Sequence, residues 1–133
     1  MEVKTAMPFD PVQKISDSEL EIMRVLWQAP DALPVSEIRR QLKARKGWED
    51  TTIKTLVQRL VKKGAILQES RQVYYYRPAV SEKEYCRWAT EELIHKVYRG
   101  SARDLVAALI SADTLSQEDV MELRSMFRSG RQP

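Results

Sequence analysis

The sequence predicts a mainly α-helical protein with one small β-hairpin. Two observations carry this prediction. Apolar residues recur at helical spacing in six separate stretches of the chain. The period changes to that of β-strands over residues 65–77, which are rich in β-branched and aromatic residues. With 133 residues, 43% of them hydrophobic, the chain is long enough for one domain or two small ones with a packed core.

The first helix should follow a flexible N-terminal arm, residues 1–14, in which Pro8 and Pro11 oppose helix formation. Ser16 and Glu19 have the spacing of a capping box, in which each side chain bonds the backbone N–H of the other residue. We therefore expect a helix from about Asp17 to Gln28. The sequence Ala-Pro-Asp at 29–31 ends it, because a residue before proline avoids helical backbone angles.

Two further helices are expected before the hairpin. The Leu-Pro-Val segment at 33–35 is long enough only for a short strand, and Ser36 is predicted to be the N-cap of a helix that runs to about Arg45. The segment Lys-Gly-Trp at 46–48 stops that helix. Asp50 or Thr51 is the predicted N-cap of the third helix, residues 51–63, and Gly64 is a suitable C-cap.

Residues 65–70 and 72–77 read as two strands joined by a tight polar turn, and Pro78 ends the second strand. Three helices, one short strand and a hairpin with a basic tip, in this order, describe a winged helix-turn-helix domain over residues 15–78. The hairpin is the wing, at 68–73, and Arg71 at its tip is placed for a phosphate or the minor groove.

The third helix is amphipathic, and its outward face carries hydroxyls, an amide and cations. Threonine and glutamine can reach base edges, while lysine and arginine neutralise phosphates. The helix therefore suits the DNA major groove, and the alternative is a solvated surface helix. The DNA-binding candidates on its outward face and flanks are Thr51, Lys54, Thr55, Gln58, Arg59 and Lys62.

Charge is concentrated around this helix. Between Arg39 and Lys63 there are nine basic residues and two acidic ones, a local charge of +7, so the rest of the chain carries about −4 against a total of +3. A surface that binds phosphates needs this asymmetry, because Lys and Arg release condensed counterions on binding. The sequence therefore favours nucleic acid as the partner.

Residues 79–128 contain three short, strongly apolar helices. Ser81 with Glu84, and Ser116 with Asp119, have capping-box spacing. Helices this short bury little of themselves, so we expect them to pair with the same helices of a second chain in a three-helix dimerisation domain. The alternative is a monomer in which they pack on the N-terminal domain. Residues 129–133 are expected to be a disordered tail. The candidate dimerisation residues are Leu105, Val106, Leu109, Ile110, Val120, Leu123 and Phe127.

Other residues carry weaker alternatives. His95, the single histidine, is more often a surface or packing residue than a pH sensor. The single cysteine, Cys86, is expected to be a small semi-buried residue and not a redox or metal sensor. Tyr74 and Tyr76 should share one strand face, mainly for core packing, and Trp27 and Trp48 should also pack in the core or at a hinge.

The same residues argue against several classes of protein. No glycine-rich phosphate loop, nucleophile elbow or metal-ligand spacing is present, so we expect no enzyme, no cofactor and no metal site. No apolar run could cross a membrane and no signal-peptide core precedes the domain, which favours a cytoplasmic protein. The alternative function is a winged helix that binds protein as a scaffold subunit, but such a surface would be apolar where helix 51–63 is polar.

Several segments together resemble the bacterial penicillinase-repressor family (BlaI/MecI, with the copper-responsive CopY repressors as relatives). They are ISDSELEIMRVLW at 15–27, VSEI at 35–38, WEDTTIKTLVQRLVKKGAI at 48–66, YYYRP at 74–78, VYRGS at 97–101 and LSQEDVMEL at 115–123. The resemblance implies a homodimeric transcriptional repressor on a DNA operator with dyad symmetry. It also implies that Thr51, Thr52, Thr55 and Arg59 contact DNA, which adds Thr52 to the candidates.

The chain departs from this family in the part that senses the signal. Penicillinase repressors are cut by a regulatory protease at an Asn-Phe bond, and Ala108-Leu109 stands at the matching place. The copper-responsive relatives have a C-terminal cysteine cluster, which this chain lacks. A regulatory protease is thus a possible partner by resemblance alone. The sequence names neither the operator, the regulated genes nor the inducing signal.

Overall fold

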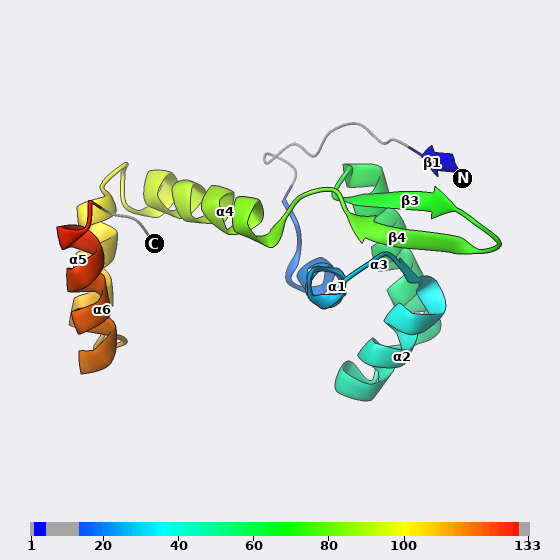
Figure 1. The fold of residues 1–133 in the computed structure, drawn as a ribbon, viewed down its shortest axis with the longest axis horizontal. Helices are drawn as coiled ribbons and strands as arrows, with labels where there is room; N and C mark the ends of the chain where they lie inside the picture. The colour runs from blue at the N-terminus through cyan, green and yellow to red at the C-terminus, as the bar shows by residue number, and fades with distance from the viewer. Residues whose placement is uncertain (1, 5–13, 131–133) are drawn as a thin grey trace. The chain divides into compact units, whose positions relative to one another are not determined.

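The computed structural model describes residues 2–4 and 14–130 and confirms a mainly helical fold with a small antiparallel sheet (Figure 1). The predicted order of three helices, hairpin and three helices is confirmed. The elements are β1 (Glu2–Lys4), α1 (Asp17–Gln28), β2 (Leu33–Pro34), α2 (Val35–Lys46), α3 (Asp50–Lys63), β3 (Ile66–Ser70), β4 (Tyr74–Pro78), α4 (Glu82–Val97), α5 (Ala102–Ser111) and α6 (Gln117–Arg128).

The N-terminal core is built from the apolar stripes of α1, α2 and α3, closed by the sheet. Each stripe follows the helical spacing of the sequence, so each of these three helices has one buried face and one solvent-exposed face. Burial of these side chains is the main stabilising term of the domain. The largest fully buried apolar side chains of the core are Ile22, Met23, Val25, Leu26, Ile38, Leu42, Ile53, Val57, Leu60 and Ile66.

The capping box that opens α1 is confirmed: Ser16 N donates to Glu19 Oε1 at 2.8 Å and Glu19 N donates to Ser16 Oγ at 3.1 Å. Two other predicted N-caps are wrong. Pro34, not Ser36, caps α2, because β2 runs directly into the helix and Pro34 already has extended angles. Glu49, not Asp50 or Thr51, caps α3, also without a side-chain bond, so Asp50 becomes the acidic residue of the first turn.

Glycines end both α2 and α3. Gly47 and Gly64 have φ values of 67° and 82°, in the left-handed region that other residues enter only at a cost. The Gly64 amide donates to the carbonyls of Leu60 and Val61 and closes α3 before β3 begins. These two stops fix the length of the helix-turn-helix, as the sequence predicts.

The sheet has the strand order β1-β3-β4-β2, and all its pairs are antiparallel. In the hairpin Gln68 lies opposite Tyr76 and Ser70 opposite Tyr74, with residues 71–73 as the turn. The second strand thus begins at Tyr74, two positions later than predicted. β1 pairs with β3 within a segment expected to be an arm without secondary structure. Residues 5–13 lie outside the described part of the chain, so the rest of the predicted arm stays a prediction.

The chain divides into two compact units, Met1–Trp88 and Ala89–Pro133. This division lies beyond Pro78, the predicted end of the first domain, because the start of α4 packs on the winged-helix core. Trp27 Nε1 donates to the Val80 carbonyl at 2.9 Å, and the Trp27 and Tyr85 rings lie 5.7 Å apart. Both tryptophans predicted to be packing residues, Trp27 and Trp48, are half-buried against the core.

The helices α4 and α6 begin as predicted. Ser81 and Glu84 bond each other's backbone at the start of α4, and Ser116 and Asp119 do the same at α6. No side chain of these three helices is buried. No helix in the described part of the chain is long and apolar enough to span a membrane.

Candidate nucleic-acid interface

The two faces of α3 separate cleanly. Ile53, Leu56, Val57 and Leu60 are buried in the core. All the candidate residues of its outer face are exposed, which leaves about four turns of polar surface open to a partner. These exposed residues are Thr51, Thr52, Lys54, Thr55, Gln58, Arg59 and Lys62.

Acidic side chains neutralise several of the cations around this face. Lys43 Nζ lies 3.2 Å from Asp50 Oδ1, and Lys46 Nζ lies 3.5 Å from Glu21 Oε1. The Arg40 guanidinium forms two hydrogen bonds with the Glu37 carboxylate, which holds the pKa of Glu37 at about 2.

The cations of the outer face of α3 are different. Lys54, Arg59 and Lys62 have no hydrogen bond or ion pair from their side chains to any residue that the structure describes. Exposed cations without a counter-charge are the ones that gain most from phosphate. The outer face of α3 therefore carries the uncompensated part of the local charge of the sequence.

A partly buried ion pair anchors the C-terminal end of α3. Lys63 Nζ bonds the Glu19 carboxylate of α1 and, at 2.7 Å, the Lys14 carbonyl. Burial raises the pKa of Glu19, but the bonds from Lys63 and Ser16 outweigh it, so the pKa lies below its ordinary value. The pair fixes α3 against α1 and so sets the angle at which the outer face is presented.

Hydrogen bonding restricts one of the threonines. Thr55 Oγ1 donates to the Thr51 carbonyl at 2.9 Å, one turn back along α3. The hydroxyl proton is thus committed, and the group faces outward as an acceptor beside its exposed methyl. Thr55 can therefore accept from an adenine or cytosine amino group or contact a thymine methyl.

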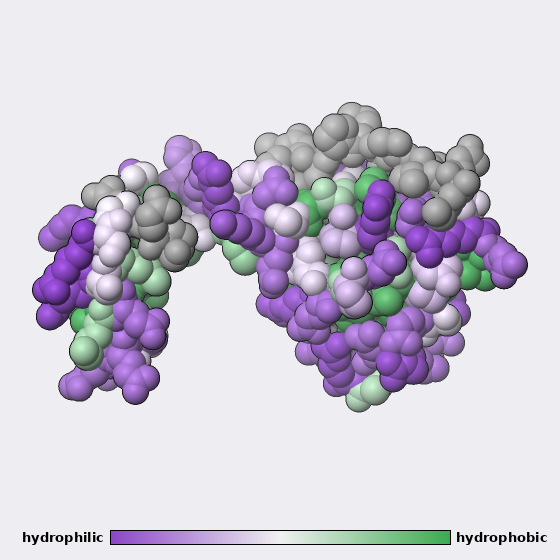
Figure 2. Space-filling view, in the orientation of Figure 1, coloured by the Kyte–Doolittle hydropathy of each residue, from purple (hydrophilic) through white to green (hydrophobic). Residues whose placement is uncertain are grey.

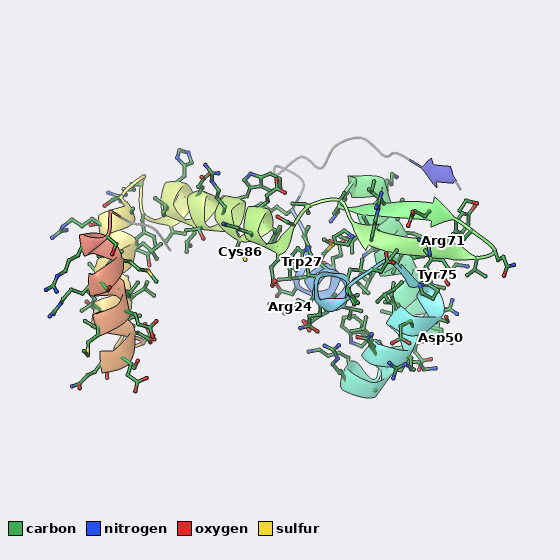
Figure 3. All side chains as sticks on the ribbon, in the orientation of Figure 1. Arg24, Trp27, Asp50, Arg71, Tyr75 and Cys86 are labelled. Carbon is green, nitrogen blue, oxygen red and sulfur yellow. The ribbon has the colours of Figure 1, made fainter. Side chains whose placement is uncertain are left out.

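The wing holds its arginine more tightly than the sequence indicates. Arg71 Nη2 lies 3.2 Å from Glu69 Oε2, and its guanidinium stacks over the Tyr75 ring, 4.2 Å from the centroid (Figure 3). Glu69 is only 5% exposed. The positive charge at the wing is therefore partly offset by a buried carboxylate, which no pattern in the sequence predicts.

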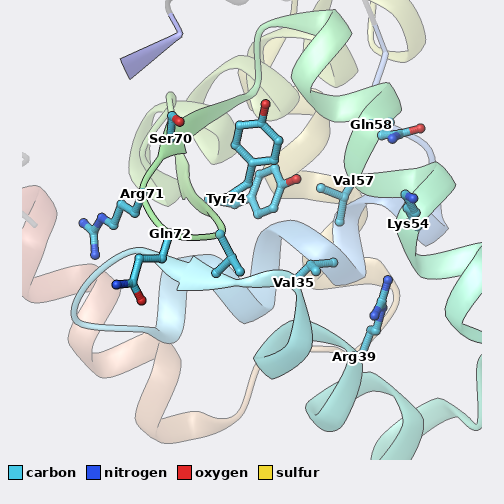
Figure 4. Close-up of a pocket in the computed structure, with 11 residues that line it drawn as sticks. Val35, Arg39, Lys54, Val57, Gln58, Ser70, Arg71, Gln72 and Tyr74 are labelled. Atoms are coloured by element: carbon cyan, nitrogen blue, oxygen red, sulfur yellow. The ribbon is translucent and has the colours of Figure 1, made fainter. Parts of the chain in front are cut away.

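A groove of about 540 Å³ lies between α3, the start of α2 and the wing (Figure 4). Arg39 extends from α2 toward the turn of α3 that carries Lys54, and Gln58 follows one turn on. Arg71 points away from them. No carboxylate is among the lining residues, which are Val35, Arg39, Lys54, Val57, Gln58, Ser70, Arg71, Gln72, Val73, Tyr74 and Tyr76.

The remaining candidates divide between core and surface. Tyr76 is buried as predicted, and burial raises the pKa of its hydroxyl. Tyr74 is exposed, so its predicted core role is wrong: β4 continues past the edge of the core toward the wing tip. Cys86 is exposed and not semi-buried, because it lies on the outer side of α4, away from Tyr85 and Trp88. His95 is exposed, as expected for a surface residue.

The predicted dimerisation residues form exposed apolar surface on α5 and α6. Six of the seven are exposed and Leu105 is half-buried. Figure 2 shows apolar residues at the surface of this unit among charged ones. Patches of large apolar side chains are costly in water and mark interaction surfaces. The largest exposed fractions on the stripe belong to Phe127, at 65%, and Ile110, at 63%.

A helix-turn-helix with a wing, whose third helix presents exposed cations, hydroxyls and an amide, defines the class of winged-helix DNA-binding proteins. The sequence matches the penicillinase repressor family over residues 15–129. The chain belongs to this family, as its motifs predict.

Characterised relatives support the same assignment. The penicillinase repressor of Bacillus licheniformis is 31% identical over 113 residues, which are 84% of this chain and 88% of the relative. The methicillin resistance regulatory protein MecI of Staphylococcus aureus is 32% identical over 86% of this chain and 93% of its own length. The solution structure of the DNA-binding domain of the repressor BlaI superimposes with a TM-score of 0.52 at 35% identity, over 59% of this chain and 94% of that domain.

Proposed function

We propose that the protein is a transcriptional repressor that binds a DNA operator with dyad symmetry as a homodimer, with α3 in the major groove. The observation that carries this proposal is the outer face of α3, where Lys54, Arg59 and Lys62 are exposed without acidic partners among residues 2–4 and 14–130. The likeness of the N-terminal unit to the DNA-binding domain of BlaI supports it. A repressor of this kind occupies the DNA that transcription requires and works in the cytoplasm.

Base reading and phosphate binding fall to different residues in this proposal. Thr51, Thr52 and Thr55 lie on the first two turns of α3 and Gln58 lies on the third, in the N-terminal part where a recognition helix approaches base edges. Lys54, Arg59 and Lys62 supply charge along its sides. Arg71 adds a wing contact only to the extent that a phosphate displaces Glu69 from its guanidinium.

Dimerisation is proposed for α5 and α6. A unit of this size with no buried side chain cannot stabilise itself by its own core. A second copy offers the same apolar stripe, so an isologous two-fold contact buries both at once. Two-fold symmetry would also place two copies of α3 on the halves of a palindromic site.

The alternative of a scaffold subunit is less well supported. Sites that bind protein are depleted in charge at their centre and enriched in aromatic residues. The outer face of α3 has no aromatic residue and three cations without partners in the described chain. Its chemistry fits a polyanion.

Release from DNA is proposed to act through residues 79–128. If a regulatory protease is involved, as the family resemblance implies, the bond between Ala108 and Leu109 is not an easy substrate. It lies inside α5, where the Ala112 amide donates to the Ala108 carbonyl at 2.9 Å. Cleavage there requires local unfolding of the helix.

The decisive experiment compares Arg59→Ala and Lys62→Ala on two duplexes, an inverted repeat sought in the DNA upstream of the encoding gene and a scrambled version. Fluorescence anisotropy from 50 to 200 mM salt gives the affinity and its salt slope. Loss of Lys62 should weaken both duplexes alike and lower the slope by roughly one unit for each protomer, because it contacts only phosphate. Lys43→Ala is the control, since Lys43 is paired with Asp50. Unchanged affinity for DNA in both variants would rule out this face of α3 as the DNA-binding surface.

A further inference from the structure

Among the groove residues, which all lie in the described part of the chain, Arg39 has a buried side-chain polar atom without a partner. It lies on α2, half-buried, and its Nε atom is buried with no hydrogen-bond partner among the residues that the structure describes. Its neighbour Arg40 is fully engaged with Glu37. A buried donor without a partner costs about 1–3 kcal/mol, so a partner in the groove that draws the guanidinium outward would be favoured.

The surroundings of Arg39 select the charge of that partner. Lys54 lines the same groove, so two cations face one space that no carboxylate lines. Tyr74 and Tyr76 lie alongside, and burial raises the pKa of the Tyr76 hydroxyl, which therefore stays neutral. Nothing in the described part of the chain compensates the two charges, and an anion in the groove would satisfy both.

The geometry points to Arg39 as a contact to a phosphodiester of the DNA backbone, shared with Lys54, so that α2 adds a phosphate clamp beside the recognition helix. The inference rests on the proposed function, since it places this phosphate on the duplex that α3 reads. Guanidinium groups bind phosphate oxygens in a bidentate manner, and lysine adds a point charge. Gln58, Ser70 and Gln72 offer further donors around the same groove.

A duplex fits this groove better than a free anion. The groove opens between α3 and the wing (Figure 4). With α3 in the major groove and the wing at the backbone or the minor groove, a sugar–phosphate strand would lie between these two elements. In helix-turn-helix proteins the helix before the recognition helix crosses the sugar–phosphate backbone. Arg39 on α2 would therefore fix the depth and register of α3 and carry no sequence information of its own.

The test uses the full-length protein with Arg39→Ala and Arg39→Gln, the second of which keeps a polar side chain without the charge. Anisotropy titrations from 50 to 200 mM salt, on the inverted repeat and its scrambled version, should show about tenfold weaker binding to both duplexes. The salt slope should fall by about 0.9 for each protomer. Arg39→Lys should keep most of the slope. Arg45→Ala is the matched control, because it removes the same charge from the far end of α2 outside the groove.

An unchanged salt slope in both variants, with or without a change in thermal unfolding, would overturn the inference, because a packing role leaves the slope intact. A loss confined to the inverted repeat would also overturn it. The second arm measures thermal unfolding with inorganic phosphate at constant ionic strength. If phosphate protects the wild type but not Arg39→Ala, and the two proteins bind DNA equally well, the groove is a site for a free anion and the inference fails. If the wild type does not prefer the inverted repeat, sequence-specific repression fails, while the slopes on scrambled DNA still decide Arg39.

Discussion

Phe127→Ala should dissociate the proposed dimer. Phe127 is 65% exposed on the apolar stripe of α6. Complete burial of a phenylalanine is worth about 1.5–3 kcal/mol, so covering the exposed part contributes roughly 1–2 kcal/mol. A two-fold contact contains the residue twice, which gives roughly 2–4 kcal/mol for the dimer. The dissociation constant should therefore rise about 30- to 700-fold.

Sedimentation equilibrium over a range of protein concentrations measures this constant directly. Met121→Ala is the matched control, because Met121 is 70% exposed on the same helix but lies off the stripe of Val120, Leu123 and Phe127. It should leave the dimer intact. A wild-type protein that sediments as a monomer at tens of micromolar, or equal effects of the two substitutions, would refute the reasoning. Circular dichroism shows whether α6 remains folded in each variant.

Two further predictions concern the anchoring of α3 and α2. The lowered pKa of Glu19 means that its contribution to stability is fully present above the unfolded pKa and is lost as the pH falls through the folded value. Urea unfolding of Glu19→Gln should show a lower free energy of unfolding than wild type at pH 7, and this difference should narrow below about pH 4.5. A difference that does not depend on pH would contradict the ion-pair explanation. Gly47→Ala should lower the free energy of unfolding by about 1 kcal/mol. The φ of Gly47 is 67° and a new Cβ would meet no atom within 4 Å, so only backbone strain acts on the variant. A stabilised variant would show that the left-handed C-cap of α2 is absent.

Local patterns in the sequence predicted most of the fold. Helix positions follow from apolar spacing and from capping residues such as Ser16, because both act within a few residues of the chain. The N-caps of α2 and α3 were wrong for the opposite reason. Pro34 belongs to a strand that pairs with Tyr75 of β4, so a distant contact decides where α2 begins.

The candidate site was predicted in part. The outer residues of α3 could be identified because burial of Ile53, Leu56 and Leu60 determines the orientation of the helix, and helical spacing assigns the rest. The role proposed for Arg39 did not follow from the sequence. In the sequence it is one of nine bases, and only the packing of α2 against α3 and the wing separates it from Arg40 next to it.

The sequence also could not predict that the charge of Arg71 is partly neutralised. A basic residue at a hairpin tip predicts a phosphate contact, but the strand register places Glu69 opposite Tyr75, and Arg71 closes over both. The pairing arises from the hairpin geometry.

The sequence by itself determined the class of the protein: a winged helix with a basic third helix, in a family of repressors, and three capped helices after it. Those features depend on local propensity and periodicity, which each segment carries within itself. Tertiary structure decided which cations remain free. Glu37 and Glu69 neutralise Arg40 and Arg71, which are two or three residues away. The α1 carboxylates Glu21 and Glu19 neutralise Lys46 and Lys63, which are distant in the sequence, and the groove and the outer face of α3 stay positive. This second kind of charge compensation depends on distances between segments that only the folded chain brings together.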